Sequence, residues 1–133
     1  MRYYMREEIR RLDPASEFYT PERCYINELS NIDADPDVSI ARVRVLPGVT
    51  TRWHRLNGLT ERYVVISGCG RIEVGSLSPQ AIGSGDVVII PSGCPQRIAN
   101  IGSEDLLFLA ICTPRFHPDV YEDIDPDPIS KNG

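Results

Sequence analysis

Three side chains in the middle of the chain have the chemical types that a catalytic or metal-binding site uses. His54 offers an imidazole, Glu61 a carboxylate and Gln96 an amide oxygen. Each lies in or beside a short apolar run that predicts a β-strand, and side chains two positions apart on a strand share one face. The sequence therefore predicts that these three side chains lie on the inner faces of three strands and line one cavity.

Further side chains lie two positions from one of these residues, so we expect them to share the same faces. Arg52, Tyr63 and Cys94 are the candidates, and all three are predicted to bind substrate. The Arg52 guanidinium suits a substrate carboxylate or phosphate, because its planar donors match those oxygens. For Cys94, inert packing is the simpler alternative, since nothing in the sequence indicates a reactive thiolate.

The elements that must hold these side chains are short strands. Apolar runs recur roughly every eight to twelve residues and are separated by Gly, Pro, Asn and Asp, a pattern typical of an all-β sandwich or barrel. Eight strands are predicted, over residues 24–29, 38–46, 50–56, 61–67, 71–74, 87–90, 96–100 and 106–112. In contrast, the spacing of Met5, Ile9 and Leu12 predicts a short N-terminal helix that stops near Asp13.

The same patterns divide the chain into three parts. Residues 1–22 form an N-terminal extension, residues 23–115 the β-barrel domain, and residues 116–133 an acidic tail that contains two Asp-Pro steps. A tail of this composition cannot bury much apolar surface, so it is predicted to lie on the surface or to be disordered.

Two spacings in the barrel region are specific enough to suggest a family. The first, from Gly48 to Gly68, reads Gly-x5-His-x-Leu-x4-Glu-x6-Gly, and the second, from Gly85 to Asn100, reads Gly-x5-Pro-x-Gly-x2-Gln-x3-Asn. These spacings resemble the two motifs of the cupin superfamily, with every Gly, Pro and Asn in register. The resemblance covers residues 48–100 directly.

The resemblance implies a cupin-like jelly-roll β-barrel, or double-stranded β-helix, with a ligand cavity and commonly a homodimeric assembly. In that family, two His and the Glu of the first motif and the His of the second bind Fe, Mn, Ni or Zn. Position by position, His54 and Glu61 match, whereas Leu56 and Gln96 stand where the other two His would be. A divalent metal held by His54, Glu61 and Gln96 would thus have fewer strong donors and lower affinity.

Three functions from different classes fit these residues. The first is a metal-assisted dioxygenase, isomerase or lyase acting on a small anionic substrate, with His54 and Glu61 as catalytic residues. The second is a metal-free epimerase, isomerase or cyclase in which His54 and Glu61 act as acid and base, and Leu56 keeps the cavity dry. The third is a non-catalytic ligand-binding module. An enzyme is favoured slightly over a binding module.

Composition excludes several other classes. The 133 residues are 41% hydrophobic and 25% charged, which is typical of one globular domain, and no apolar run approaches the roughly 20 residues of a membrane span. Much of the net charge of −5 lies in the tail, so no basic surface for nucleic acid is expected. The N-terminus lacks the apolar core of a signal peptide and the four cysteines form no CxxC pair, so a cytoplasmic location with free thiols is predicted.

Overall fold

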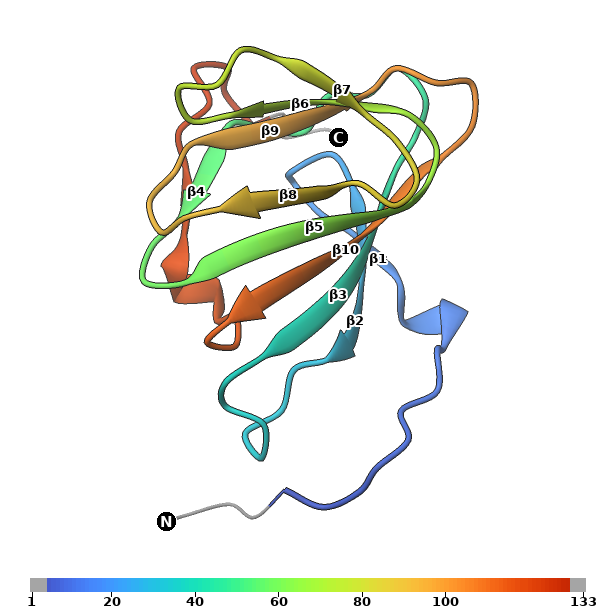
Figure 1. Ribbon diagram of the computed structural model, residues 1–133, viewed down its shortest axis with the longest axis vertical. Helices are drawn as coiled ribbons and strands as arrows, with labels where there is room; N and C mark the ends of the chain where they lie inside the picture. The colour runs from blue at the N-terminus through green and yellow to red at the C-terminus, as the bar shows by residue number, and fades with distance from the viewer. Residues whose placement is uncertain (1–4, 130–133) are drawn as a thin grey trace.

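The structure is a computed structural model that describes residues 5–129. Its strands form two antiparallel sheets that face each other, as Figure 1 shows. The six-stranded sheet has the order β1 (Phe18–Tyr19), β2 (Tyr25–Ser30), β3 (Ser39–Val45), β10 (Leu106–Thr113), β5 (Thr60–Ser67) and β8 (Val87–Ile90). The five-stranded sheet has the order β11 (Tyr121–Asp123), β4 (His54–Leu56), β9 (Gln96–Asn100), β6 (Gly70–Val74) and β7 (Gln80–Ile82).

This arrangement confirms the predicted all-β jelly roll. All eight predicted strands are present, most with ends within one residue of the expected ones. The exception is the predicted strand 50–56, of which only His54–Leu56 forms a strand, while Thr50 makes a single bridge to Ala99. Three short edge strands, β1, β7 and β11, were not predicted because two or three residues are too few to show a period of two.

The core lies between the sheets and follows the alternation of each strand. Along β10 every second side chain is buried, and Leu106 and Phe108 are among the most completely buried residues. Phe108 packs on Tyr63, with ring centroids 4.4 Å apart. Burial of one such aromatic or aliphatic side chain contributes about 1.5–3 kcal/mol to folding.

The predicted N-terminal helix is wrong. Residues 5–13 have no regular structure, and only a 3-10 turn, η1 (Pro14–Ser16), follows them. Met5, Ile9 and Leu12 are all exposed, so the apolar stripe has no surface of its own chain to pack against. A short helix without such packing is marginal in water, which accounts for the difference.

The described part of the tail lies on the surface, which is one of the two predicted alternatives, since none of residues 116–129 is buried, but its first half is ordered and joins a sheet. A 3-10 turn, η2 (Pro118–Val120), leads into β11, which pairs with β4 at the edge of the five-stranded sheet. Val120 and Tyr121 pack against the buried cluster that contains Leu56, and polar contacts add to this packing. Asp123 accepts a hydrogen bond from Arg52, and Asp125 accepts one from the Trp53 main chain at 2.9 Å.

Both segments that flank the expected barrel boundaries at residues 23 and 115 therefore contribute strands to the sheets. In the described part of the chain, no helix is long and apolar enough to cross a membrane.

Candidate functional site

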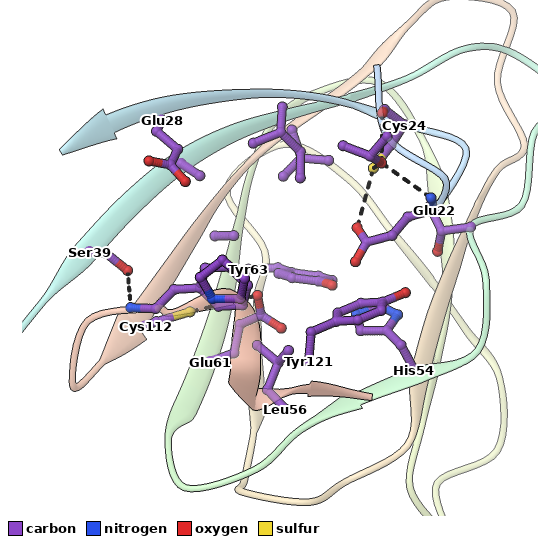
Figure 2. Close-up of a pocket in the computed structure, with 18 of the residues that line it drawn as sticks. Glu22, Cys24, Glu28, Ser39, His54, Leu56, Glu61, Tyr63, Cys112 and Tyr121 are labelled. Carbon is purple, nitrogen blue, oxygen red and sulfur yellow. Dashed lines mark hydrogen bonds between the residues drawn. The ribbon is translucent and has the colours of Figure 1, made fainter. Parts of the chain in front are cut away.

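A cavity of about 480 Å³ opens between the two sheets. Its walls come from the six-stranded sheet, from β4 and β9, from the turn that joins β1 to β2, and from β11. Most of the lining is apolar, including Ile26, Val43, Leu56, Ile98, Phe108 and Ala110. The polar side chains that Figure 2 labels converge on this space, so the cavity has the size and composition typical of a small-molecule site.

Glu61 is the buried carboxylate of the cavity. It points inward from β5, where Glu61, Tyr63 and Val65 alternate with outward-facing residues as the sequence predicts. Its Oε1 accepts a hydrogen bond from Gln96 Nε2 at 2.7 Å, and the Cys112 thiol lies 3.8 Å from Oε2. Burial raises the pKa of Glu61 to about 7, although the Gln96 hydrogen bond acts in the opposite direction.

His54 lies on β4, opposite Gln96 of β9, and only 5% of it is exposed. Its Nδ1 is 2.8 Å from the carbonyl oxygen of Arg52. Because a carbonyl oxygen can only accept, Nδ1 carries the proton and Nε2 of the neutral ring is left as an acceptor. The ring stacks on Tyr121 with centroids 5.2 Å apart. The imidazole is therefore held by the hydrogen bond at Nδ1 and by the stacking contact on its face.

Tyr63 places a hydroxyl in the cavity without giving it a partner. Only 5% of the residue is exposed, and within residues 5–129 no side-chain hydrogen bond reaches its hydroxyl. Burial, followed by the charge of Glu61, raises the pKa of Tyr63 well above its usual value. The hydroxyl is therefore a neutral group, able to donate and to accept, that is available to a ligand.

The structure adds a second carboxylate that the sequence analysis did not select. Glu22 lies in the turn between β1 and β2, where its main-chain oxygen accepts a hydrogen bond from the Arg52 main chain at 3.2 Å. The next residue, Arg23, has a positive φ of 72°, so the turn is sharp. The Cys24 thiol lies 3.6 Å from Glu22 Oε2, and Figure 2 shows the carboxylate directed into the cavity.

Tyr121 was missed for a similar reason, since it belongs to the tail that was predicted to stay outside the fold. Burial, together with the charge of Glu22, raises the pKa of Tyr121. Neither Glu22 nor Tyr121 lies in a periodic apolar run, so no local pattern indicated that either residue belongs to the site. The Arg23 conformation and the pairing of β11 with β4, which place them, are tertiary features.

The other predicted site residues lie outside the cavity lining. Arg52 does not share a face with His54, because residues 51–53 are not part of a strand. Its side chain turns toward the tail, where Nε is 2.8 Å from Asp123 Oδ2 and a terminal nitrogen donates to the Asp127 carbonyl. Cys94 is half-buried with its thiol 3.7 Å from the Pro95 oxygen.

Gln96 lies behind Glu61 and is fully buried. Its Nε2 bonds Glu61, while its Oε1 has no hydrogen-bond partner among the described residues. Of the predicted residues, His54, Glu61 and Tyr63 thus line the cavity, and Gln96 supports Glu61 from outside it.

The donor set does not fit a zinc- or iron-type centre. Two imidazoles or thiolates are the usual minimum for these metals, and the cavity lining contains one imidazole, that of His54. The two oxygens of Glu61 face the Gln96 amide and the Cys112 thiol, and Gln96 turns its donor nitrogen toward the same carboxylate. Across residues 5–129, no three His, Cys, Asp or Glu side chains are grouped as metal ligands.

Comparison with known proteins places this geometry in a family. A family model described as a cupin domain matches residues 41–112. No curated protein matches the chain. Many solved structures share its fold, and three of them are described next.

Oxalate decarboxylase from Bacillus subtilis has a TM-score of 0.74 at 17% identity, and the match covers 92% of this chain and 34% of that one. A predicted oxalate decarboxylase from Thermotoga maritima has a TM-score of 0.63 at 28% identity, covering 68% of this chain and 80% of that one. KdgF from Halomonas sp. has a TM-score of 0.64 at 16% identity, with 73% and 83% covered.

Proposed function

Since this chain belongs to the cupin family, we propose that its barrel cavity binds a small, largely apolar molecule and that Glu61, beside His54, transfers a proton to or from it. The observation that carries this proposal is the placement of Glu61. The residue is 7% exposed, and its carboxyl group lies on the wall of a cavity that is lined mainly by apolar side chains. The reaction classes that fit are epimerisation, isomerisation and cyclisation, each of which needs a proton to be moved within a dry site.

The environment of Glu61 suits a group that must both take up and release a proton. With a pKa of about 7, both protonation states are populated near neutral pH. Gln96 can serve each state in turn. Its amide nitrogen donates to the carboxylate, and its amide oxygen, after rotation of the amide, accepts from the protonated acid.

His54 is positioned as the partner of Glu61 in this proposal. The Arg52 carbonyl fixes its tautomer, so the unprotonated Nε2 is the atom that can accept a proton or a hydrogen bond from the ligand. The positive charge that the ring would acquire lowers the pKa of Glu61, so the two groups are electrostatically coupled. A coupled carboxyl and imidazole allow one to act as acid while the other acts as base.

The metal-assisted reaction with an anionic substrate is the less favoured alternative. The cavity offers one imidazole, and burial raises the pKa of the Cys24 and Cys112 thiols in its wall, which disfavours the thiolate form that binds metal. Arg52, the expected anion-binding group, is engaged by Asp123. Elemental analysis tests this alternative. About one Fe, Mn, Ni or Zn ion per chain after metal loading would support it and count against the proposal made here.

A non-catalytic binding module is the second alternative. What favours it is that both oxygens of Glu61 already face donors within the protein, at 2.7 Å from Gln96 and 3.8 Å from Cys112. A carboxyl group held in this way could serve only to shape the cavity. The two readings differ in turnover, because a binding module would exchange no hydrogen of its ligand.

The experiment is a hydrogen-exchange screen in deuterated water. A panel of small carbonyl compounds is incubated with the protein, and exchange of carbon-bound hydrogen is followed by NMR. We expect exchange with at least one apolar carbonyl compound and its loss, by about a hundredfold or more, in Glu61→Gln. Glu104→Gln, an exposed residue outside the cavity, is the matched control. Exchange that survives in Glu61→Gln would contradict the proposal.

Two further expectations stay predictions. The homodimer is supported by exposed apolar side chains on one side of the six-stranded sheet, Ile66 of β5 and Val87 and Ile89 of β8. Sedimentation analysis would decide whether the chain pairs. The cytoplasmic location would be tested by fractionation of cells that express the protein.

A further inference from the structure

We propose that the cavity selects an organic cation, an ammonium group on an apolar body, which Glu22 and Glu61 hold while the hydroxyl of Tyr63 and Nε2 of His54 accept its hydrogen bonds. This inference rests on the proposed function, since it names the class of ligand that the same cavity takes. It replaces the expected anionic ligand with one of opposite charge.

The charge of the cavity lining supports a cationic ligand. Four acidic residues contribute to the cavity wall, Glu22, Glu28, Glu61 and Asp123, and no Lys or Arg among the described residues does so. Asp123 is neutralised by Arg52, but neither Glu22 nor Glu28 has a salt-bridge partner in residues 5–129. Glu28 is exposed and screened by water, whereas Glu22 is half-buried among largely apolar walls, so the charge of Glu22 is screened less and favours a cation over an anion.

A hydroxyl group in the cavity supports the same ligand class independently of the acidic side chains. Only 5% of Tyr63 is exposed, and the residue lines the cavity. None of the hydrogen bonds among the described residues reaches its hydroxyl group. Figure 2 shows Tyr63, Glu61 and Glu22 around one space. Among the described residues, the buried side-chain atoms that lack a partner are Arg42 Nε and Gln96 Oε1, so the Tyr63 hydroxyl oxygen is accessible from the cavity, where it can donate to or accept from a ligand.

The hydrogen-bonding groups of the cavity wall are mostly acceptors, which also favours a ligand that donates. The groups that face the space as acceptors are the Glu22 carboxylate and Nε2 of His54, and the Tyr63 hydroxyl accepts as readily as it donates. An ammonium group has donors and no acceptor, so it satisfies all three. A carboxylate ligand would satisfy only the hydroxyl and would be repelled by Glu22.

Aromatic side chains in the cavity wall favour a cation as well. Tyr63, Phe108 and Tyr121 line the cavity, and their ring faces attract a cation. Aromatic faces combined with carboxylates form the usual environment for recognition of an organic ammonium ion. The remaining aliphatic lining, such as Val43 and Ile98, then contacts the apolar body.

The experiment compares three probes of nearly equal shape, benzylammonium, benzyl alcohol and benzoate, by calorimetry near neutral pH. Each is small enough for a cavity of about 480 Å³. We expect benzylammonium to bind more tightly than benzoate by at least about tenfold, the ratio that about 1.4 kcal/mol produces. In Glu22→Gln this preference should fall to near unity, whereas Glu104→Gln, which removes the same charge far from the cavity lining, should keep it.

Several results would overturn the inference. Benzoate binding as tightly as benzylammonium, or no binding of any probe at millimolar concentration, would contradict it, as would an unchanged preference in Glu22→Gln. The comparison of probes on the unmodified protein keeps the test decisive if Glu22→Gln does not fold. If the charge preference fails while hydrogen exchange still depends on Glu61, only the ligand class is wrong and the proposed function stands.

Discussion

Glu61 makes the stability of the fold depend on pH in a direction opposite to that of an ordinary paired carboxylate. Its pKa is about 7 in the folded protein against an ordinary value of 4.5. Between these values the folded state binds more protons than the unfolded state, so the free energy of unfolding falls as the pH rises. The contribution of Glu61 is greatest below pH 4.5 and is lost as the pH passes through about 7.

The size of this effect follows from the difference between the two pKa values. One unit of pKa corresponds to about 1.4 kcal/mol, so ionisation of Glu61 costs the fold about 3 kcal/mol once it is complete. The residue is 7% exposed, so solvent screening removes little of this cost. Glu61→Gln keeps the shape of the side chain but has no ionisation to oppose folding.

The assay is urea unfolding of the unmodified protein and of Glu61→Gln at several pH values. Other groups titrate over the same range, but they cancel in the difference between the two proteins. We expect the stability of Glu61→Gln relative to the unmodified protein to rise by about 2 to 3 kcal/mol between about pH 5 and about pH 8. A difference that stays constant over this range, or that falls, would refute the argument that Glu61 is a desolvated acid.

Three other predictions follow from particular contacts. Gly68→Ala should destabilise the fold by more than about 1 kcal/mol in thermal melts, because an added Cβ would lie 2.8 Å from the main-chain oxygen of Asp105. Gly48 also has a positive φ, but no atom lies within 4 Å of an added Cβ there, so Gly48→Ala should lower the stability less. Leu56→His would add a second imidazole to the cavity wall and should raise the nickel or zinc bound per chain in elemental analysis, and unchanged metal content would count against the ligand argument. A thiol reagent should modify the exposed Cys69 in the native protein. It should not modify Cys112, because burial shields this thiol and raises its pKa to about 12. Rapid modification of Cys112 would show that the cavity wall opens.

The sequence predicted the parts of the structure that depend on local alternation. The inward faces of β5 and β9 follow from the alternation of side chains along each strand, so the burial of Glu61, Tyr63 and Gln96 could be foreseen. The same rule failed for Arg52, because it assumed a strand that begins at residue 50, whereas β4 begins at His54. Because residues 50–53 lie outside β4, the Arg52 guanidinium turns toward Asp123 in the tail and away from the cavity.

The rest of the site depends on contacts that no local pattern encodes. Tyr121 reaches the cavity only because β11 pairs with β4, sixty or more positions earlier in the chain, through an acidic segment whose composition predicts no burial. Glu22 is placed by a turn with a positive φ at a non-glycine residue, Arg23. The acidic character of the cavity, and hence the class of ligand, could therefore be read only from the fold.

The central claim is that Glu61 is a buried acid poised to gain or lose a proton at neutral pH. A carbon-13 NMR titration of the side-chain carboxyl groups tests it most directly, with the Glu61 signal assigned by its absence in Glu61→Gln. We expect a titration midpoint of about 7 for this carboxyl group, because its burial raises the pKa. A midpoint near the ordinary value of 4.5 would contradict it, because Glu61 would then be a solvated carboxylate with no proton to offer at neutral pH.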